Sequence, residues 1–205
     1  MNKLCVTLAV LGVLMLGLTL GGLALLMRGG ISARVEPTAI EAAVAGKLRR
    51  VGIPGSFRKL RNPVTSSKQV VAAGRAHFAD HCAICHANDG SGQTEIGRNL
   101  YPRTPDLRLG ETQQLTDGEI FYIIDNGVRL TGMPAWGDGS EESKRASWHL
   151  VTFIRHLPQL TPEEKLEMEH LNPKSPEEWR ELQREEEFLK GNEPSGQSDE
   201  RSHHH

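Results

Sequence analysis

Cysteine is scarce in this chain, with three in 205 residues, and the three are unevenly placed. Cys82 and Cys85 lie close together, whereas Cys5 stands far away in an apolar run. A structural zinc site would need a second pair of ligands at short spacing, which Cys5 does not provide. The chain also lacks runs that alternate between apolar and polar residues, so it lacks the strand and helix context of a thioredoxin-like dithiol. These absences argue against zinc binding and thiol redox chemistry, which remain as alternatives.

The close pair belongs to the five-residue motif Cys82-Ala83-Ile84-Cys85-His86. Two thiols three positions apart, followed at once by a histidine, are typical of covalent haem attachment. Both sulfurs can reach the vinyl groups along one porphyrin edge, and the adjacent imidazole can turn under the iron. We therefore predict one haem c (heme c), attached through Cys82 and Cys85, with His86 as the proximal iron ligand.

The methionines supply the candidate for the second axial ligand. Met1, Met15 and Met27 belong to the N-terminal apolar segment, and Met168 lies in an acidic helical stretch. Met133 instead stands between a glycine and a proline, on a stiff turn that suits a ligand better than a core residue. We expect Met133 to bind the iron. A bis-histidine iron is the alternative, and the other histidines considered are His77, His81, His149, His156 and His170.

Residues 66–159 resemble a class I c-type cytochrome of the monohaem bacterial kind. Beyond the haem motif, Gly74 and Phe78 match the pair by which the first helix of that family crosses the last one. Leu150 and Phe153 match their partners on the last helix. A glycine allows close approach of two helices, and an aromatic ring fills the crossing. The resemblance implies an all-α protein with the class I cytochrome c fold around one covalent haem.

The resemblance also implies roles for residues after the haem motif. Pro105 matches the proline whose carbonyl accepts a hydrogen bond from the proximal imidazole, which would orient His86. Pro102 is the alternative for that role. The same region carries donors suited to the haem propionates, whose charge is costly to bury unpaired. These candidates, which could equally be ordinary surface residues, are Arg98, Tyr101, Arg103 and Trp136.

Three helices are expected in the central domain from the sequence pattern. Apolar spacing predicts one over Ser67–Cys85. A capping-box spacing at Thr116–Glu119 begins a second, which ends at Asn126–Gly127. A third runs from Glu141 to Leu157 and stops at a proline. Since a domain of about ninety residues gains limited stability from apolar burial alone, the haem would supply much of the core, and the apo form should fold poorly.

The N-terminal segment lacks charge from Leu4 to Met27. As a helix it would span about 36 Å, enough to cross a bilayer and longer than the apolar region of a cleavable signal peptide. We predict a retained single-pass signal-anchor over residues 1–33, although Ile31–Ala33 would suit cleavage. Basic residues on the two sides of the span do not clearly favour one topology. In bacteria covalent haem attachment takes place outside the cytoplasmic (inner) membrane, so the resemblance implies a haem domain in the periplasm or outside.

Charge is unevenly spread although the formal net charge is only −2. A helix predicted over Pro37–Arg50 in the basic arm has an apolar face, which could lie on anionic lipid, dock a partner or be a solvated connector. The acidic arm has helix starts at Thr161 and Ser175. The two arms could also pair with each other. The predicted division is a signal-anchor (1–33), a basic linker or arm (34–65), the haem domain (66–160), an acidic helical extension (161–190) and a disordered tail (191–205), whose terminal histidines could bind metal or derive from a tag.

A His/Met iron has no open position for substrate, so the predicted function is electron transfer by an Fe(III)/Fe(II) cycle. We predict an electron carrier and not an enzyme, tethered to the membrane by its N-terminal helix, with a redox protein or a membrane respiratory complex as partner. No nucleic-acid partner or small-molecule substrate is expected. One alternative is a haem subunit of a larger membrane oxidoreductase. Another is a haem sensor or peroxidase-like enzyme, which would need a vacant or labile sixth position.

Overall fold

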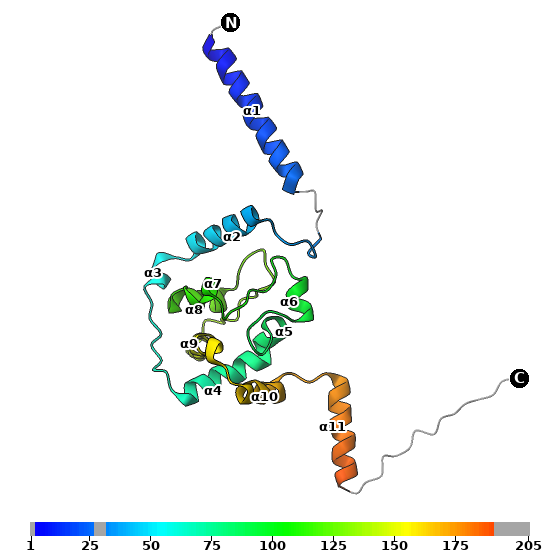
Figure 1. Ribbon diagram of the computed structural model, residues 1–205. Helices are drawn as coiled ribbons and strands as arrows, with labels where there is room; N and C mark the ends of the chain where they lie inside the picture. Colours follow the sequence, from blue (N-terminus) through cyan, green and yellow to red (C-terminus); the bar gives the residue numbers. More distant parts are fainter. Residues whose placement is uncertain (1–2, 27–31, 191–205) are drawn as a thin grey trace, which may run out of the picture.

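The computed structural model describes residues 3–26 and 32–190, and its regular structure over these two ranges is helical throughout, without strands (Figure 1). The all-α prediction is confirmed. The predicted tail of residues 191–205 and the end of the apolar run at Met27 lie outside the described residues. The elements are α1 (Lys3–Leu26), α2 (Ala39–Gly52), α3 (Gly55–Arg58), α4 (Lys68–His77), the π-helix η2 (Phe78–Cys82), α5 (Ala83–His86), α6 (Glu95–Asn99), α7 (Gly110–Gln113), α8 (Asp117–Asn126), α9 (Glu141–His156), the 3₁₀-helix η3 (Leu157–Gln159), α10 (Pro162–Leu171) and α11 (Pro176–Leu189).

Helices α4 and α9 cross at Gly74, and this crossing organises the central domain. A Cβ atom at Gly74 would overlap the carbonyl oxygen of His149 and lie 2.9 Å from the Cβ of Phe153, so the two backbones meet more closely than any side chain would allow. One turn further, Phe78 packs against Phe153 with ring centroids 5.2 Å apart. Both rings and Leu150 are buried. The crossing predicted from these residues is confirmed.

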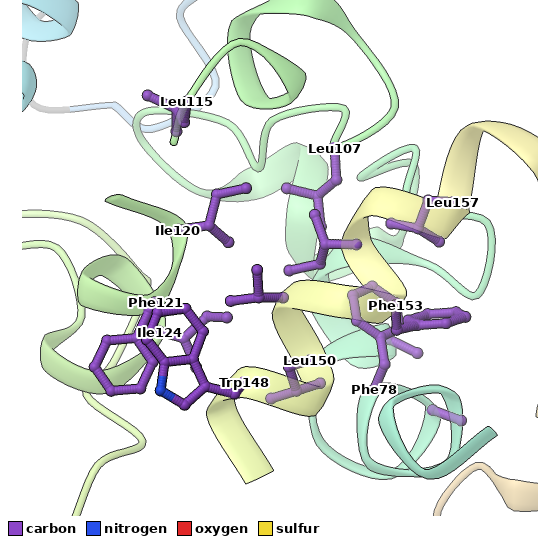
Figure 2. Packing of buried hydrophobic residues seen from close by; sticks show 14 of the residues in the cluster. Phe78, Leu107, Leu115, Ile120, Phe121, Ile124, Trp148, Leu150, Phe153 and Leu157 are labelled. Atoms are coloured by element: carbon purple, nitrogen blue, oxygen red, sulfur yellow. The ribbon is translucent and has the colours of Figure 1, made fainter. Parts of the chain in front are cut away.

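The buried core lies between α4, α8 and α9 (Figure 2). Trp148 of α9 stacks on Phe121 of α8, with ring centroids 4.3 Å apart and planes 16° apart. Helix α8 begins with the predicted capping box, in which Thr116 and Glu119 each accept a backbone N–H of the other. The core cluster consists of Phe78, Ala79, Ala83, Leu107, Leu115, Ile120, Phe121, Ile124, Trp148, Leu150, Val151, Phe153, Ile154, Leu157 and Met168.

The run predicted as one helix over Ser67–Cys85 is continuous but contains a π-helical turn. The N–H of Ala83 donates to the carbonyl of Phe78, five residues earlier, where an α-helix would use the carbonyl four residues earlier. Such turns are rare, and they occur frequently at functional sites. Apolar spacing does not distinguish a single π turn from the α-helix around it, so the sequence pattern does not predict this one.

The basic arm, predicted as a linker, packs on the central domain through its C-terminal part. Ile53 is buried, and the half-buried ring of Phe57 meets that of Tyr122 edge-on, with centroids 4.9 Å apart. Gly118 makes room for this segment, because a Cβ atom there would overlap the carbonyl oxygen of Phe57. Arg58 adds an ion pair to Glu119 at 3.8 Å. The arm is therefore anchored next to α8.

The acidic extension divides into a docked helix and an exposed one. Helix α10 packs on α4 and η2 and inserts Met168, whose exposure is 0%, into the core. Glu164 of α10 binds Arg75 of α4 at 2.8 Å and His156 of α9 at 2.9 Å. Helix α11 has no buried residue. Within the described residues no hydrogen bond or ion pair joins 34–65 to 161–190, whereas each of these arms has such contacts with the central domain.

We expect Glu164→Gln to lower the free energy of unfolding by about 1–2 kcal/mol at pH 7. Partial burial acts to raise the pKa of Glu164, but hydrogen bonds from His156 and the Thr161 N–H, with the Arg75 charge, outweigh it and lower that pKa. The stabilisation is therefore complete above the ordinary pKa of 4.5 and is lost as the pH falls below it.

Thermal unfolding of the holoprotein, followed by circular dichroism, should thus show a difference between Glu164→Gln and wild type that shrinks on acidification. The exposed neighbour Glu163 gives a matched control, since Glu163→Gln should change stability little at either pH. If Glu164→Gln and wild type differed in unfolding temperature by the same amount at neutral and acidic pH, the charged carboxylate of Glu164 would not be what stabilises the docking of α10.

Helix α1 is exposed over its described side chains and extends away from the central domain (Figure 1). The segment Lys3–Leu25 is long and apolar enough to cross a membrane. A signal sequence near an N-terminus has the same properties. The structure is thus compatible with the predicted anchor and with a cleaved leader.

Candidate haem-binding site

Cys82, Cys85 and His86 lie at the end of the helical run formed by α4, η2 and α5. Cys82 closes the π turn, and the other two residues belong to α5. The run ends at Ala87, whose φ of 60° is uncommon for a residue with a side chain. The N–H of Ala87 still donates to the carbonyl of Ala83, at 2.8 Å. The motif is therefore held by a rigid helix on one side and by a sharp backbone turn on the other.

Both thiols of the motif are held in their neutral form. Burial, with a smaller contribution from Cys85, raises the pKa of Cys82 to about 12. Burial also raises the pKa of Cys85. A dithiol redox centre needs the opposite shift, because its nucleophile is a thiolate with a lowered pKa. The environment of these cysteines thus disfavours the thioredoxin-like alternative.

The imidazole of His86 is also neutral. Burial lowers its pKa to about 4, opposed in part by the backbone carbonyl of Pro105, which favours the protonated ring. The Nδ1 atom is buried without a hydrogen-bond partner of normal geometry. The proline carbonyl that acts on His86 belongs to Pro105 and not to Pro102. A neutral imidazole is the form that binds a metal, and the carbonyl next to it is suited to set its orientation.

The segment that carries Pro105 is tied to the haem motif by Arg108. Its guanidinium pairs with Asp106 at 2.7 Å and with Asp89 at 3.2 Å, so one side chain joins the two loops. The hydrogen bond from Arg108 is the main cause that lowers the pKa of Asp106. A backbone bond from the Leu107 N–H to the carbonyl of Gly90, at 2.8 Å, adds to this. The position of Pro105 relative to His86 is therefore fixed by contacts outside the motif.

The loop directly after the motif folds back on it, because the N–H of Gly92 donates to the carbonyl of His86 at 2.8 Å. Gly92 has a φ of 71°, and a Cβ atom there would lie 2.5 Å from the carbonyl oxygen of Thr104. Only glycine fits such a position without strain. The backbone after the motif can therefore fold back closely against the segment that leads to Pro105.

Met133 is half-buried in a loop that follows α8. Its N–H donates to the hydroxyl of Thr131 at 3.1 Å, and its carbonyl accepts the N–H of Val128 at 3.0 Å. A Cβ atom on Gly132 would lie 2.7 Å from Leu100, so this loop packs against the loop that precedes Pro105. The methionine is thus carried by a hydrogen-bonded turn, as expected for a fixed ligand. That it binds iron stays a prediction.

The four residues predicted to contact propionates are placed differently from one another. The Tyr101 hydroxyl donates to Glu41 at 3.2 Å, and Arg103 pairs with Glu36 at 2.6 Å. Both side chains therefore bind carboxylates, the chemical group of a propionate, although these carboxylates belong to the basic arm. Arg98 is exposed, and Trp136 is half-buried. Their contact with propionates stays a prediction.

Some histidines of the bis-histidine alternative contact aromatic or acidic side chains. His77 and His81 meet edge to face with ring centroids 4.8 Å apart, and His81 meets Trp136 in the same way at 5.3 Å. His156 pairs with Glu164, while His149 lies at the helix crossing and His170 is exposed.

Residues 69–154 match the family model described as cytochrome c oxidase, cbb3-type, subunit III. This segment is a c-type cytochrome domain. No curated protein matches the chain. The match spans the haem motif, Pro105, Met133 and the crossing of α4 with α9. It implies a covalently bound haem c, in agreement with the cysteines at positions 82 and 85.

The residues of the cytochrome domain fit that cofactor. The Nδ1 atom of His86 is buried next to the carbonyl of Pro105, which leaves the other ring nitrogen of the neutral imidazole for a metal, and the two cysteines stand at the spacing that haem attachment needs. Sequence reasoning did not identify Arg108, because an arginine near two aspartates has no distinctive spacing. Its role depends on Asp89, nineteen positions away, and is visible only once the loops are folded.

Proposed function

We propose that this protein is a membrane-tethered periplasmic c-type cytochrome that carries electrons between redox partners, with His86 and Met133 as its iron ligands. The cytochrome domain itself serves haem-based electron transfer. The observation that carries the proposal is the placement of His86 directly behind Cys82 and Cys85 at the end of α5, with the carbonyl of Pro105 next to its ring. These groups suit a haem that is permanently attached and an iron with a fixed proximal ligand.

The bound haem supplies a one-electron couple between Fe(III) and Fe(II). Cys82 and Cys85 would hold its edge, and His86 would offer a lone pair to the iron while the carbonyl of Pro105 sets the orientation of the ring. Met133 would supply the second iron ligand through its thioether sulfur. The ion pairs of Arg108 and the turn around Met133 restrain both ligands, and such restraint suits a carrier whose coordination should not change with oxidation state.

The location rests on α1 and on the haem. The exposed apolar helix supports a single-pass anchor in the bacterial cytoplasmic membrane. In bacteria covalent haem attachment takes place outside that membrane, which supports a cytochrome domain in the periplasm. A retained anchor would keep the carrier close to membrane-bound redox partners.

A haem c subunit of a larger membrane oxidoreductase is the second candidate function. The family model takes its description from a subunit of an oxidase complex. Helix α11 also exposes apolar side chains, among them Trp179 and Leu189 at 55% and 77% exposure, which a permanent partner would cover. Extraction in mild detergent distinguishes the two candidates, because a subunit would copurify with fixed partners and a free carrier would not.

We expect Met133→Ala to remove the weak red absorption band that arises from charge transfer between sulfur and ferric iron. The variant should also have a lower reduction potential, since a thioether ligand raises the potential. Its reduced form should bind carbon monoxide, because one axial position is then open. Optical spectra and a redox titration of the holoprotein measure all three.

Met168→Leu gives the control, since Met168 is a fully buried core residue and its loss should leave the band in place. A wild-type protein without the band would contradict His/Met ligation and favour the bis-histidine alternative. Ready binding of carbon monoxide by the reduced wild type would instead favour a sensor or peroxidase-like enzyme.

A further inference from the structure

Helix α2 exposes a narrow apolar stripe that no part of the described chain covers. None of its residues is buried. At the spacing of an α-helix, the apolar side chains fall within about 80° of one another. They are Ile40, Val44, Leu48 and Val51, with exposures of 77%, 51%, 66% and 77%.

Basic side chains border this stripe on one side, and Glu41 borders it on the other. Lys47 and Arg50 lie along one border of the stripe. The only acidic residues between positions 34 and 68 are Glu36 and Glu41, and both are directed to the cytochrome domain, where they bind Arg103 and Tyr101. The outer surface of α2 is therefore apolar and cationic.

The position of α2 in the chain puts it near the proposed anchor. Twelve residues separate the end of α1 at Leu26 from the start of α2 at Ala39. Even a fully extended connection of this length reaches only about 40 Å. An apolar helix face bordered by lysine and arginine, at that distance from a membrane span, has the chemistry of a helix that lies in the headgroup region of an anionic bilayer.

We propose that α2 lies on the membrane, with its apolar stripe in the headgroup region and Lys47 and Arg50 at anionic lipid phosphates. This inference rests on the membrane tether of the proposed function. It has a consequence for the haem. Glu41 holds Tyr101, and Leu100 next to it packs on Gly132 in the loop of Met133. A membrane-bound α2 would therefore fix the orientation of the methionine side of the haem relative to the bilayer.

Spin labels on the full-length holoprotein test the inference in lipid nanodiscs of phosphatidylcholine with phosphatidylglycerol. The background is Cys5→Ser, because Cys82 and Cys85 are consumed by the haem. Labels are placed by Val44→Cys on the stripe and Ala42→Cys on the opposite side of α2. Relative accessibility to oxygen and to a water-soluble nickel chelate reports depth. We expect the label at Val44 about 5–10 Å below the headgroup surface, and the label at Ala42 in water.

A third label, from Leu14→Cys in α1, separates this inference from the proposed tether. If Leu14 is deep in the bilayer and Val44 is as accessible to nickel as Ala42, the placement of α2 is wrong while the tether stands. If Leu14 is accessible to nickel, the tether itself is wrong. A label at Val44 that is shielded from both oxygen and nickel would show a protein contact, such as a second copy of the chain, and would also overturn the placement.

The anionic lipid has its own test. Lys47→Gln with Arg50→Gln should move the label at Val44 toward water in the mixed lipid, and wild-type charges in phosphatidylcholine alone should have the same effect. A depth that is independent of both changes would contradict binding to anionic headgroups.

Discussion

The double variant Cys82→Ser and Cys85→Ser should carry no covalent haem at all. Each thiol supplies one of the two bonds to the porphyrin, so each single variant should retain one attachment and a reduced yield of holoprotein. The domain of the double variant should also lose fixed tertiary structure, because Cys82 packs against the core cluster and the haem is expected to complete that core. Haem staining of the denatured protein on a gel and near-ultraviolet circular dichroism measure the two effects.

Cys5→Ser is the matched control for the double variant, since Cys5 is exposed on α1 and should not affect haem content. Haem that survives denaturation of the double variant would contradict attachment at the motif. Zinc bound in proportion to the two cysteines would favour the zinc alternative. A double variant that keeps a native near-ultraviolet spectrum would show that the polypeptide core does not depend on the haem.

Gly74→Ala should destabilise the holoprotein by about 3 kcal/mol, at the upper end for an added core methyl group. The added Cβ would overlap the carbonyl oxygen of His149, and a helix backbone cannot rotate away as a side chain can. Helices α4 and α9 would have to separate, which would loosen the contact of Phe78 with Phe153. Thermal unfolding should show a decrease in Tm of more than about 10 °C.

Gly46→Ala in α2 provides the comparison, because a Cβ there has no atom within 4 Å. It should not lower the stability of the holoprotein, since alanine is also the better helix former. If Gly74→Ala unfolded at the wild-type temperature, the close approach of α4 and α9 would not be a requirement of the fold.

The parts of the fold that could be predicted from sequence are those determined by neighbouring residues. The capping box at Thr116 is a four-residue pattern, and the end of α9 follows from the proline after Leu157. The crossing at Gly74 was also predictable, through the family resemblance. The docking of Phe57 and Met168 could not be predicted, because each contact joins segments that lie far apart in the chain. The residues next to an apolar side chain in the sequence do not show whether that side chain is exposed or packed against another segment.

The candidate site shows the same division. The haem motif is local, so Cys82, Cys85 and His86 could be named directly. Met133 could be reached only by comparing the methionines, and its role stays a prediction. The contacts of Tyr101 and Arg103 with Glu41 and Glu36 could not be foreseen, since they depend on where the basic arm folds. Arg108 was missed for the same reason.

The burial of Met168 bears on the order in which this protein is built. A chain is synthesised from its N-terminus, so the haem motif emerges long before α9 can cross α4 and before α10 can close the core. Haem attachment can therefore occur on a chain whose native core is incomplete and whose thiols are not yet buried. The surroundings that raise the pKa of both thiols form only when the polypeptide has folded. The order of folding therefore favours the incompletely folded chain as the substrate for attachment.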